Sequence, residues 1–379
     1  MISFSDDETC WLRLQAQRLL PGEGGKGASA AQVVQALCGL QAQEAGAAVL
    51  GVRARSTGLL AEDVEHARVE ERSLVRTWGL RGTLHLLAAA DLGWLVALLG
   101  PLFASKNQRR YRELGLDEET IARGIQVIRK TLSSRGPLAR AEIGRELAKE
   151  GIPTEGQALI HLIGRAALEG YVCLGPDQGS QPSYVLVEDW IDVDPAPSGE
   201  AALAELARRY LEAYGPAGPA DLAAWSGLGT GEARRAWELI SQDRVEVQAA
   251  GRPAWMLAER LDAQPAGLEA QRDRSPSVRL LPRYDTYLLG YAGRELAVPP
   301  QHARRINAGG GIIHAAVLVD GRALGTWRIE KKRDRLEILV DPFEALDPLL
   351  LPELETEAED IGRFYGLETG LQILPPGLS

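Results

Sequence analysis

The stretch LVRTWGLRGTLHLL (residues 74–87) contains two short β-prone segments and a turn, and it decides the fold class of the chain. Residues 74–80 and 83–87 are rich in leucine, valine and aromatic side chains, and Arg81-Gly82 provides turn residues between them. Apolar residues at helical spacing predict three short helices before this hairpin, over residues 31–43, 46–55 and 60–67. Three helices followed by a hairpin are the element order of a winged helix.

The same order recurs twice further along the chain. Predicted helices over 118–134, 140–149 and 156–169 precede strands 171–174 and 183–187, with a Gly/Pro/Gln-rich tip at 175–182. After a linker over 192–199, helices over 201–214, 219–226 and 230–240 precede strands 245–248 and 254–257. We therefore predict winged-helix domains over residues 1–115, 116–194 and 198–262.

The last hundred residues have a different pattern. Strands are predicted over 278–281, 312–319, 322–330 and 336–340, a type I′-like turn over 319–322 and a closing helix over 351–365. The fold class is therefore α+β: three tandem winged-helix domains and a C-terminal, mostly β, barrel-like domain over residues 275–379.

Two glutamines, Gln41 and Gln43, flank the small residue Ala42 at the end of the first predicted helix. In a continuous helix these two side chains point about 200° apart, so only a bend or a helix end lets both amides face one cavity. A carboxamide is no base near neutral pH, but its donors and acceptor suit it to holding a water molecule. That chemistry fits a reaction whose leaving group is already activated.

Composition limits the classes of protein that this chain can represent. With 379 residues, of which 45% are hydrophobic, it is long enough for two to four domains. Its 3 cysteines are scattered, which favours a reducing cytoplasm and gives no zinc-binding spacing. The acidic N-terminus lacks the basic region of a secretory signal. The apolar run 84–104 contains His85, Asp91 and Pro101, so we interpret it as a strand followed by a buried helix, not as a membrane span.

The net charge of −10 argues against a nucleic-acid partner, but the basic residues are clustered. Each cluster is either a solvated face or a phosphate-binding patch. Arg76 and Arg81 flank the first predicted wing, where a surface ion pair explains them nearly as well as a phosphate contact. The remaining clustered cations are Lys106, Arg109, Arg110, Arg112, Arg304, Arg305, Lys331, Lys332, Arg333 and Arg335.

Four motifs together resemble the AlkZ-like winged-helix DNA glycosylases, of the type that acts on interstrand crosslinks. They follow the same order as in that family and extend over nearly the whole chain. They are GLQAQE (39–44), LVRTWGLRGTLHL (74–86), LLPRYDTYLL (280–289) and VLVDGRALGTWR (317–328).

The resemblance implies a C-shaped scaffold of three tandem winged helices around a concave DNA channel. It implies excision of alkylated purines from double-stranded DNA, including bases joined in crosslinks. The family's glutamine, hydrophobic residue, glutamine signature corresponds to Gln41, Ala42 and Gln43, and Ala42 is the smallest residue for the middle position. It also implies a C-terminal hairpin that probes a groove, for which residues 304–314, with Asn307 and three glycines, are the candidate.

The predicted activity is that of a monofunctional, cytoplasmic, monomeric DNA glycosylase without metal or cofactor, in which Gln41 and Gln43 position water. Alkylation at N7 makes a purine cationic and weakens its N-glycosidic bond. No lysine lies near the glutamines in sequence, which disfavours a Schiff-base lyase. Two alternatives remain: a noncatalytic winged-helix regulator that binds one undamaged sequence, and a protein-interaction scaffold without affinity for DNA.

Three further residues each have two interpretations. Glu44 is either a general base or an ion-paired side chain beyond a helix end. His85 either lines the channel or is a hydrogen-bonded structural histidine. Asp285 lines the channel, or it caps a helix or pairs with Arg283.

Overall fold

The computed structural model describes residues 2–20, 25–192, 197–262 and 275–376, and the chain forms two units. One unit contains Met1–Val64 together with Ala204–Ser379, and the other contains Glu65–Leu203. Because both ends of the chain build the first unit, residues far apart in sequence meet in its core. Part of the linker predicted over 192–199 lies outside the described residues.

The hairpin predicted around Arg81-Gly82 forms in the second unit. Strand β5 (Leu74–Trp78) runs antiparallel to β6 (Leu84–Ala88), and the short 3-10 turn Leu80–Gly82 joins them. Arg81 and Gly82 have left-handed backbone there, with φ of 56° and 67°. Glycine adopts this conformation without strain, which is why the sequence located the turn correctly.

The second predicted wing is longer than expected. β8 (Val172–Gln178) and β9 (Gln181–Leu186) continue to pair through most of the segment assigned to the tip, and only Gly179 and Ser180 form the turn. β7 (Leu138–Ala139) pairs with β9, and β5 joins β8 through Arg76 and Leu174. In this unit the strands thus follow the order β6, β5, β8, β9, β7.

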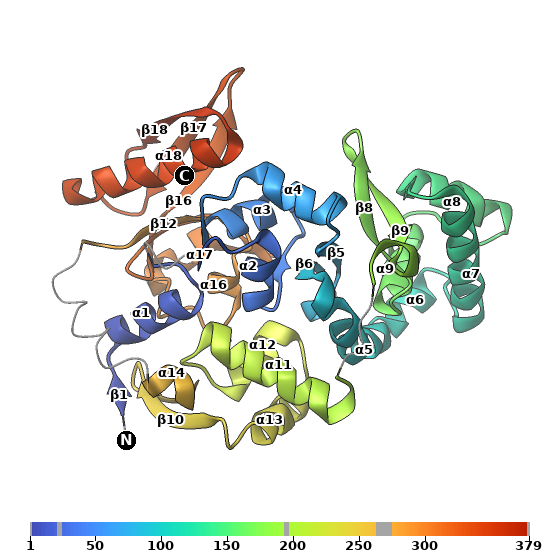
Figure 1. Ribbon diagram of the computed structural model, residues 1–379, viewed down its shortest axis with the longest axis horizontal. Helices are drawn as coiled ribbons and strands as arrows, with labels where there is room; N and C mark the ends of the chain where they lie inside the picture. Colours follow the sequence, from blue (N-terminus) through green and yellow to red (C-terminus); the bar gives the residue numbers. More distant parts are fainter. Residues whose placement is uncertain (1, 21–24, 193–196, 263–274, 377–379) are drawn as a thin grey trace. The chain divides into compact units, whose positions relative to one another are not determined.

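Helices pack around these strands, with α7, α8 and α9 beside the ribbon of β8 and β9 (Figure 1). The helices predicted over 118–134, 140–149 and 156–169 are confirmed within two residues at each end. The helices that begin in this unit are α5 (Ala89–Lys106), α6 (Gln108–Glu113), α7 (Glu118–Arg135), α8 (Arg140–Lys149), α9 (Ala158–Leu168), α10 (Val187–Trp190) and α11 (Gly199–Tyr214).

Helix α5 is long and apolar enough to cross a membrane by length and composition, and it is the one such helix among the described residues. Its packing is that of a core helix. A Cβ on Gly100 would lie 1.9 Å from the carbonyl oxygen of Leu168, so the absent side chain lets α5 approach the end of α9 closely. Trp94, Leu95 and Phe103 on α5 are all buried.

In the first unit the predicted helix over 31–43 is wrong at its end. Helix α2 stops at Ala36, and residues 40–41 form a strand instead. The helices predicted over 46–55, 60–67, 201–214, 219–226 and 230–240 are confirmed. The N-terminal elements are α1 (Asp6–Ala16), α2 (Ala30–Ala36), β3 (Leu40–Gln41), α3 (Ala45–Arg53) and α4 (Ala61–Val69).

A hairpin follows helices α12 (Pro219–Ser226) and α13 (Thr230–Leu239). Its strands β10 (Arg244–Ala249) and β11 (Arg252–Leu257) confirm the third predicted hairpin. Strand β1 (Ser3–Phe4) adds to β10 in parallel, which no local sequence pattern indicated. A parallel pair joins segments distant in the chain, so its partner cannot be inferred from spacing.

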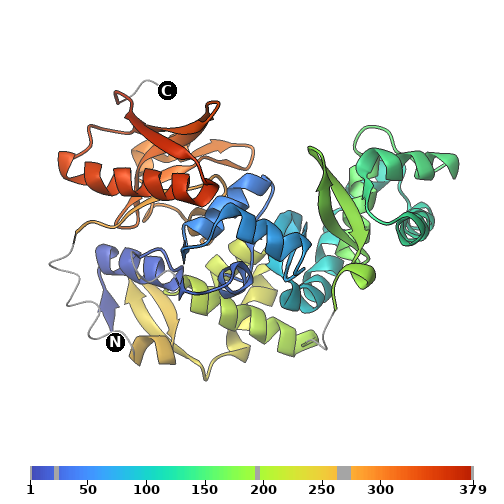
Figure 2. The ribbon, with the colours of Figure 1, turned by 45° about the horizontal axis from the view of Figure 1, so that its top comes forward.

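The C-terminal part of this unit is an open sheet, not the predicted barrel. Its order is β12, β15, β16, β17, β18, with β12 and β18 at separate edges, and α18 lies along it (Figure 2). The predicted type I′-like turn is confirmed, because Asp320 (φ 47°) and Gly321 (φ 84°) both have positive φ. The elements are β12 (Val278–Leu281), β15 (Ala316–Val319), β16 (Arg322–Lys331), β17 (Arg335–Pro342), α18 (Leu351–Tyr365) and β18 (Glu368–Ile373).

The strand predicted over 312–319 is interrupted at His314. Its first part, β14 (Ile312–Ile313), pairs with β13 (Asn307–Gly309) in a separate small hairpin that follows α17 (Ala303–Ile306). The His314 N–H donates to the Ile306 carbonyl at 2.9 Å, so at this point the chain leaves the ladder of the main sheet.

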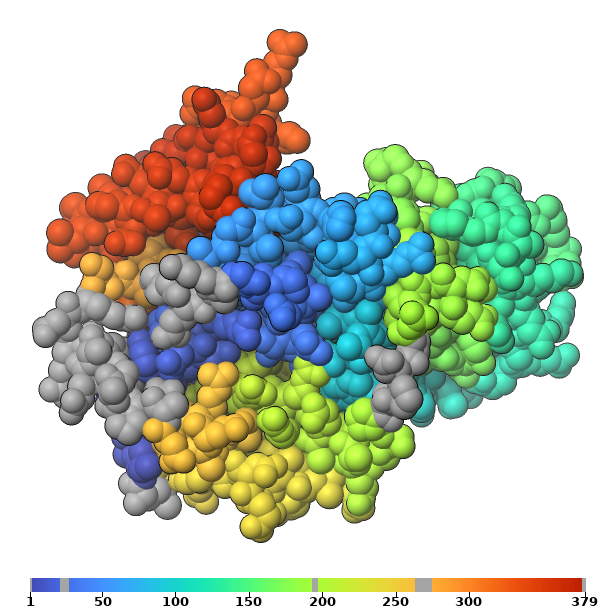
Figure 3. All heavy atoms as spheres, in the orientation of Figure 1, coloured from blue at the N-terminus to red at the C-terminus, as the bar shows by residue number. Residues whose placement is uncertain are grey.

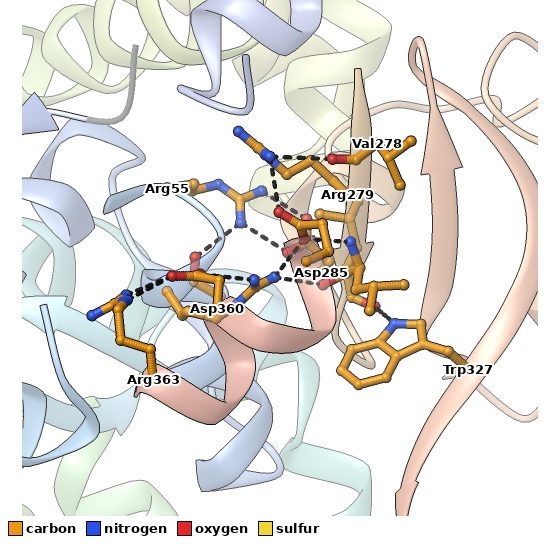
Figure 4. A network of polar contacts seen from close by, with 12 residues as sticks. Arg55, Val278, Arg279, Asp285, Trp327, Asp360 and Arg363 are labelled. Atoms are coloured by element: carbon orange, nitrogen blue, oxygen red, sulfur yellow. Dashed lines mark hydrogen bonds and ion pairs between the residues drawn. The ribbon is translucent and has the colours of Figure 1, made fainter. Parts of the chain in front are cut away.

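Two arginines at the end of α3 make buried ion pairs that hold this unit together (Figure 4). The Arg55 guanidinium binds both carboxylate oxygens of Asp285, at 2.7 and 2.8 Å, and both side chains are fully buried. Arg53 donates to Glu357 and to Asp360, each at 3.0 Å. Burial alone would raise the pKa of Glu357, but Arg53 and Arg279 together lower it.

Removal of the Asp285 carboxylate should be strongly destabilising. Asp285→Ala leaves the Arg55 charge buried without its partner, which costs about 3–5 kcal/mol of unfolding free energy. Replacing both residues, Arg55→Met with Asp285→Leu, should recover much of that loss. Urea denaturation measures the free energy of unfolding of the single and the double variant. Asp7→Ala is the control, because Asp7 forms an exposed ion pair with Arg322. A loss from Asp285→Ala no larger than that of the control would contradict the prediction.

Candidate functional site

The two glutamines lie outside the helix, shortly after a tight helix end. The N–H of Cys38 donates to the Gln35 carbonyl at 3.0 Å, and the N–H of Gly39 donates to the Val34 carbonyl at 3.1 Å. These are the two bonds of a Schellman cap, with Cys38 (φ 54°) in the left-handed position that glycine usually takes. The sequence did not predict this end of α2, because Gly39 follows the left-handed position instead of occupying it.

The glutamines therefore lie beyond the helix, where the angular separation of a continuous helix does not apply. Gln41 ends strand β3, and Gln43 lies in the bend that precedes α3. Ala42 is 0% exposed, Gln41 is partly exposed and Gln43 is exposed. The residue between the two glutamines is thus buried, and both glutamines are at least partly exposed.

Helix α11 supports the turn that leads into the glutamines. The Arg209 guanidinium donates to the Gln35 carbonyl, and the Tyr214 hydroxyl donates to the Leu37 carbonyl at 3.1 Å. Tyr214 also shares a hydrogen bond of 2.5 Å with the Thr286 hydroxyl, and burial raises the pKa of the phenol. The carbonyls that α2 leaves without helical partners are therefore bound by side chains.

Glu44 follows the glutamines directly and begins helix α3, although its side chain caps no backbone N–H of that helix. Its carboxylate accepts a hydrogen bond from Arg283 at 2.5 Å, and both side chains are partly exposed. Of the two interpretations of Glu44, the structure favours the ion pair. Arg283 was expected to pair with Asp285 instead.

Of the two interpretations of Asp285 and of His85, the structural one is favoured, because both side chains are buried. Asp285 accepts from the Tyr287 N–H at 2.8 Å, which confirms the capping prediction, and its ion-pair partner is Arg55. The Nδ1 of His85 lies 3.0 Å from the Thr83 carbonyl. Burial, with a smaller contribution from Arg81, lowers the pKa of His85 to about 3, so the ring is neutral at physiological pH.

The predicted phosphate-binding residues of the second unit lie at two places. Arg76 is on β5, where burial lowers its pKa, and Arg81 is in the adjoining turn. Arg109 and Arg110 are on α6, and each pairs with Glu113, at 2.9 and 3.1 Å. The Lys106 ammonium at the end of α5 lies over the Phe103 ring, and Arg112 is also on α6.

In the first unit the predicted cations lie around the C-terminal sheet. Arg304 and Arg305 are on α17, and Arg305 pairs with Asp341 at 2.7 Å. The exposed Asn307 begins β13, where its Oδ1 accepts from the Gly309 N–H at 3.3 Å. The remaining cations, Lys331, Lys332, Arg333 and Arg335, lie where β16 turns into β17, a hairpin that projects from the sheet (Figure 3).

Within the ranges that the structure describes, no three His, Cys, Asp or Glu side chains gather closely enough to hold a metal ion. The three cysteines, Cys10, Cys38 and Cys173, are buried free thiols. Burial raises the pKa of Cys10 to about 11 and that of Cys173 to about 12, so neither is a thiolate at neutral pH.

The chain is similar to known proteins in sequence and in structure. The sequence matches the AlkZ-like DNA glycosylase family model over residues 34–364. The chain belongs to this family. It is 28% identical over 355 residues to the interstrand DNA cross-link repair glycosylase of Streptomyces sahachiroi, covering 89% of this chain and 91% of that protein. The solved structure of the Streptomyces sahachiroi DNA glycosylase AlkZ matches with a TM-score of 0.83 and 26% identity, covering 98% of this chain and 100% of that one.

The AlkZ-like family relationship confirms the resemblance and the enzyme class predicted from the sequence. As a DNA glycosylase, the chain is an enzyme that acts on N-glycosyl bonds of DNA. The structural match extends over both units, and the fold mixes helices with sheets as predicted. The domain boundaries and the roles of individual residues remain predictions.

Sequence analysis missed several residues that hold the glutamine segment of this AlkZ-like enzyme. Arg209 and Tyr214 support the helix end before the glutamines, and Arg283 binds the residue after them. Sequence analysis assigned no role to Arg55, which ends the helix predicted over 46–55. Arg283 lies in the family motif LLPRYDTYLL (280–289), but only Asp285 of this motif was predicted as a site residue.

The neutral, buried His85 should make stability depend on pH. In the unfolded chain the imidazole takes up a proton near pH 6.5, whereas in the folded chain it does so only near pH 3. Stability should thus be complete above about pH 6.5 and fall by up to about 1.4 kcal/mol per pH unit below it. The free energy of unfolding, measured by urea denaturation, should fall between pH 7.5 and pH 5.0 by about 2 kcal/mol less in His85→Gln than in the wild type. Equal losses in both proteins would contradict the assignment.

Proposed function

We propose that this enzyme is a monofunctional DNA glycosylase that hydrolyses the N-glycosidic bond of N7-alkylated purines, with Gln41 and Gln43 positioning the attacking water. The observation that supports this proposal is the burial pattern of residues 41–43, in which Ala42 is buried and both glutamines are at least partly exposed. Two carboxamides provide donors and acceptors that can fix one water molecule in orientation as well as position.

The chemistry requires little acid or base catalysis. In an N7-alkylated purine the ring carries a positive charge, so breaking the bond between C1′ and N9 sends the bonding electrons to the base and neutralises it. The water oxygen then bonds to C1′ and releases one proton to solvent. The enzyme needs only to hold the water and to stabilise the positive charge that develops on the sugar. Amides suit the first task, and nearby DNA phosphates suit the second.

The absence of a nearby amine in the sequence supports hydrolysis over lyase chemistry. A bifunctional glycosylase attacks C1′ with an amine and forms a Schiff base. The sequence has no lysine between Lys26 and Lys106, so none adjoins the glutamine segment along the chain.

The relatives suggest a broader substrate range and a shared DNA-binding arrangement. One relative is named as an interstrand DNA cross-link repair glycosylase, and we propose that this enzyme also unhooks such crosslinks. In this proposal three winged-helix domains, over 1–115, 116–194 and 198–262, and the C-terminal domain over 275–379 bind double-stranded DNA as a monomer in the cytoplasm. The proposed phosphate contacts are Arg76, Arg81, Lys106, Arg109, Arg110, Arg304, Arg305, Asn307, Lys331 and Lys332.

Loss of both glutamines should abolish base release. Gln41→Ala with Gln43→Ala should slow single-turnover release of N7-methylguanine from duplex DNA by at least about a hundredfold, because the water loses its preorganised partners. Gln126→Ala, which removes an exposed amide from α7, should leave the rate unchanged. The same assay on a nitrogen-mustard crosslink tests unhooking. A folded wild-type protein that binds duplex DNA but releases base from neither substrate would contradict the proposal.

Glu44 should contribute little as a base. A general base typically contributes 10²- to 10⁴-fold, whereas the Glu44 carboxylate is already paired with Arg283. Glu44→Gln should therefore lower the single-turnover rate by less than about tenfold. A loss of a hundredfold or more, with the affinity for duplex DNA unchanged, would make Glu44 the base and the glutamines its supports.

A further inference from the structure

A cavity of about 570 Å³ lies beside the C-terminal sheet of the first unit, and its wall is predominantly cationic. Arg304 and Arg305 come from α17, and Arg328 comes from β16. Arg283 enters from the segment after β12, and His314 comes from the break between β14 and β15. Asp341 on β17 is the one carboxylate that lines it.

Part of this wall is fixed by contacts of Arg305. Arg305 pairs with the buried carboxylate of Asp341 at 2.7 Å and donates to the Pro342 carbonyl at 3.3 Å. Its guanidinium carbon also lies 4.9 Å from the centroid of the Phe343 ring. Four arginines and one carboxylate line the cavity. Arg283 also pairs with Glu44, and Arg328 pairs with Glu330 at 3.2 Å, and neither of these two carboxylates belongs to the lining.

The wall of the cavity is held in shape by a tryptophan. The Trp327 Nε1 donates to the Leu281 carbonyl at 2.7 Å, and its ring is buried in the core (Figure 4). This bond fixes β16 against the end of β12. Arg328 follows Trp327 and Arg283 lies two residues beyond Leu281, so the bond helps to keep both arginines in the lining of one cavity.

The rim of the cavity is accessible to a large ligand. The Arg328 side chain is 55% exposed and Arg304 is also exposed. Guanidinium groups bind phosphate oxygens in a bidentate manner and stay charged at all physiological pH values. Because the cationic groups converge from several elements around an open cavity, the ligand that fits best is a phosphate group carried on a larger molecule.

Arg283 connects this cavity to the proposed catalytic segment. Its guanidinium lines the cavity and also binds Glu44, the residue after Gln43. We propose that the arginine cavity binds a backbone phosphodiester of the DNA, and that Arg283 sets the position of Gln43 relative to that phosphate. The proposal rests on the proposed function. It makes Arg283 a positioning residue and assigns Arg304 and Arg328 to substrate binding.

The salt dependence of binding to undamaged duplex DNA tests the cavity without requiring base release. The logarithm of affinity falls with the logarithm of salt concentration, with a slope of about −0.9 for each phosphate neutralised. Arg304→Ala with Arg328→Ala should make that slope shallower by about 1, as expected for the loss of one phosphate contact. Arg322→Ala is the matched control, since Arg322 is a partly exposed arginine on β16 outside the cavity, and its slope should equal that of the wild type.

Arg283→Ala should lower the rate of base release even when all the DNA is bound, and not only the affinity for DNA. At saturating protein, its single-turnover rate on N7-methylguanine DNA should fall at least about tenfold, and Arg283→Lys should recover part of it. If the salt dependence of DNA binding is the same in the cavity variants as in the wild type, the phosphate assignment is wrong. It is also wrong if the protein binds a mononucleotide tightly and this mononucleotide competes poorly with duplex DNA. A wild type that binds DNA with the predicted slopes yet releases no base would refute the proposed function while leaving the phosphate assignment intact.

Discussion

The buried bidentate contact between Arg55 and Asp285 is the constraint on which the candidate site depends. It fixes residues 283–285 against the end of α3, and Arg283 binds Glu44 at the start of the same helix. One short segment from late in the chain therefore holds both ends of α3. Arg53 adds contacts to α18 through Glu357 and Asp360, so the C-terminal sheet and the glutamine segment form one rigid part of the first unit.

The glutamine segment is held from its other side by the end of α2. The Schellman cap, Arg209 and Tyr214 together satisfy the last carbonyls of that helix and direct the chain into extended backbone. Ala42 is buried, whereas Gln41 and Gln43 are at least partly exposed. A water-positioning pair needs two amides that hold a fixed relation without reorganisation during the reaction, and a segment anchored at both ends supplies that preorganisation.

Local signals predicted most of the helices and hairpins, because caps, periodicity and turn residues act over a few residues. Ser29 with Gln32 starts α2, and Asp320-Gly321 forms the β15–β16 turn, both as such signals require. The end of α2 was not predictable in this way, since Cys38 takes the position where glycine is expected. Pairings that depend on the tertiary fold were also not predicted. These are the pairing of β1 with β10, the pairing of β18 with β17, and the ion pair of Asp285 with Arg55 instead of Arg283. The family motifs suggested a catalytic role for Gln41 and Gln43, which stays a prediction, and the backbone conformation around them came only from the structure.

The central claim is that Gln41 and Gln43 act together upon one water molecule. A crystal structure of the enzyme with duplex DNA that carries a cationic azasugar in place of the damaged nucleotide tests it most directly, because that sugar mimics the charge developing at C1′. The account predicts both amides within about 2.6–3.2 Å of a single water molecule beside the azasugar. Amides that point to opposite sides of the segment, or an azasugar bound away from both of them, would contradict it.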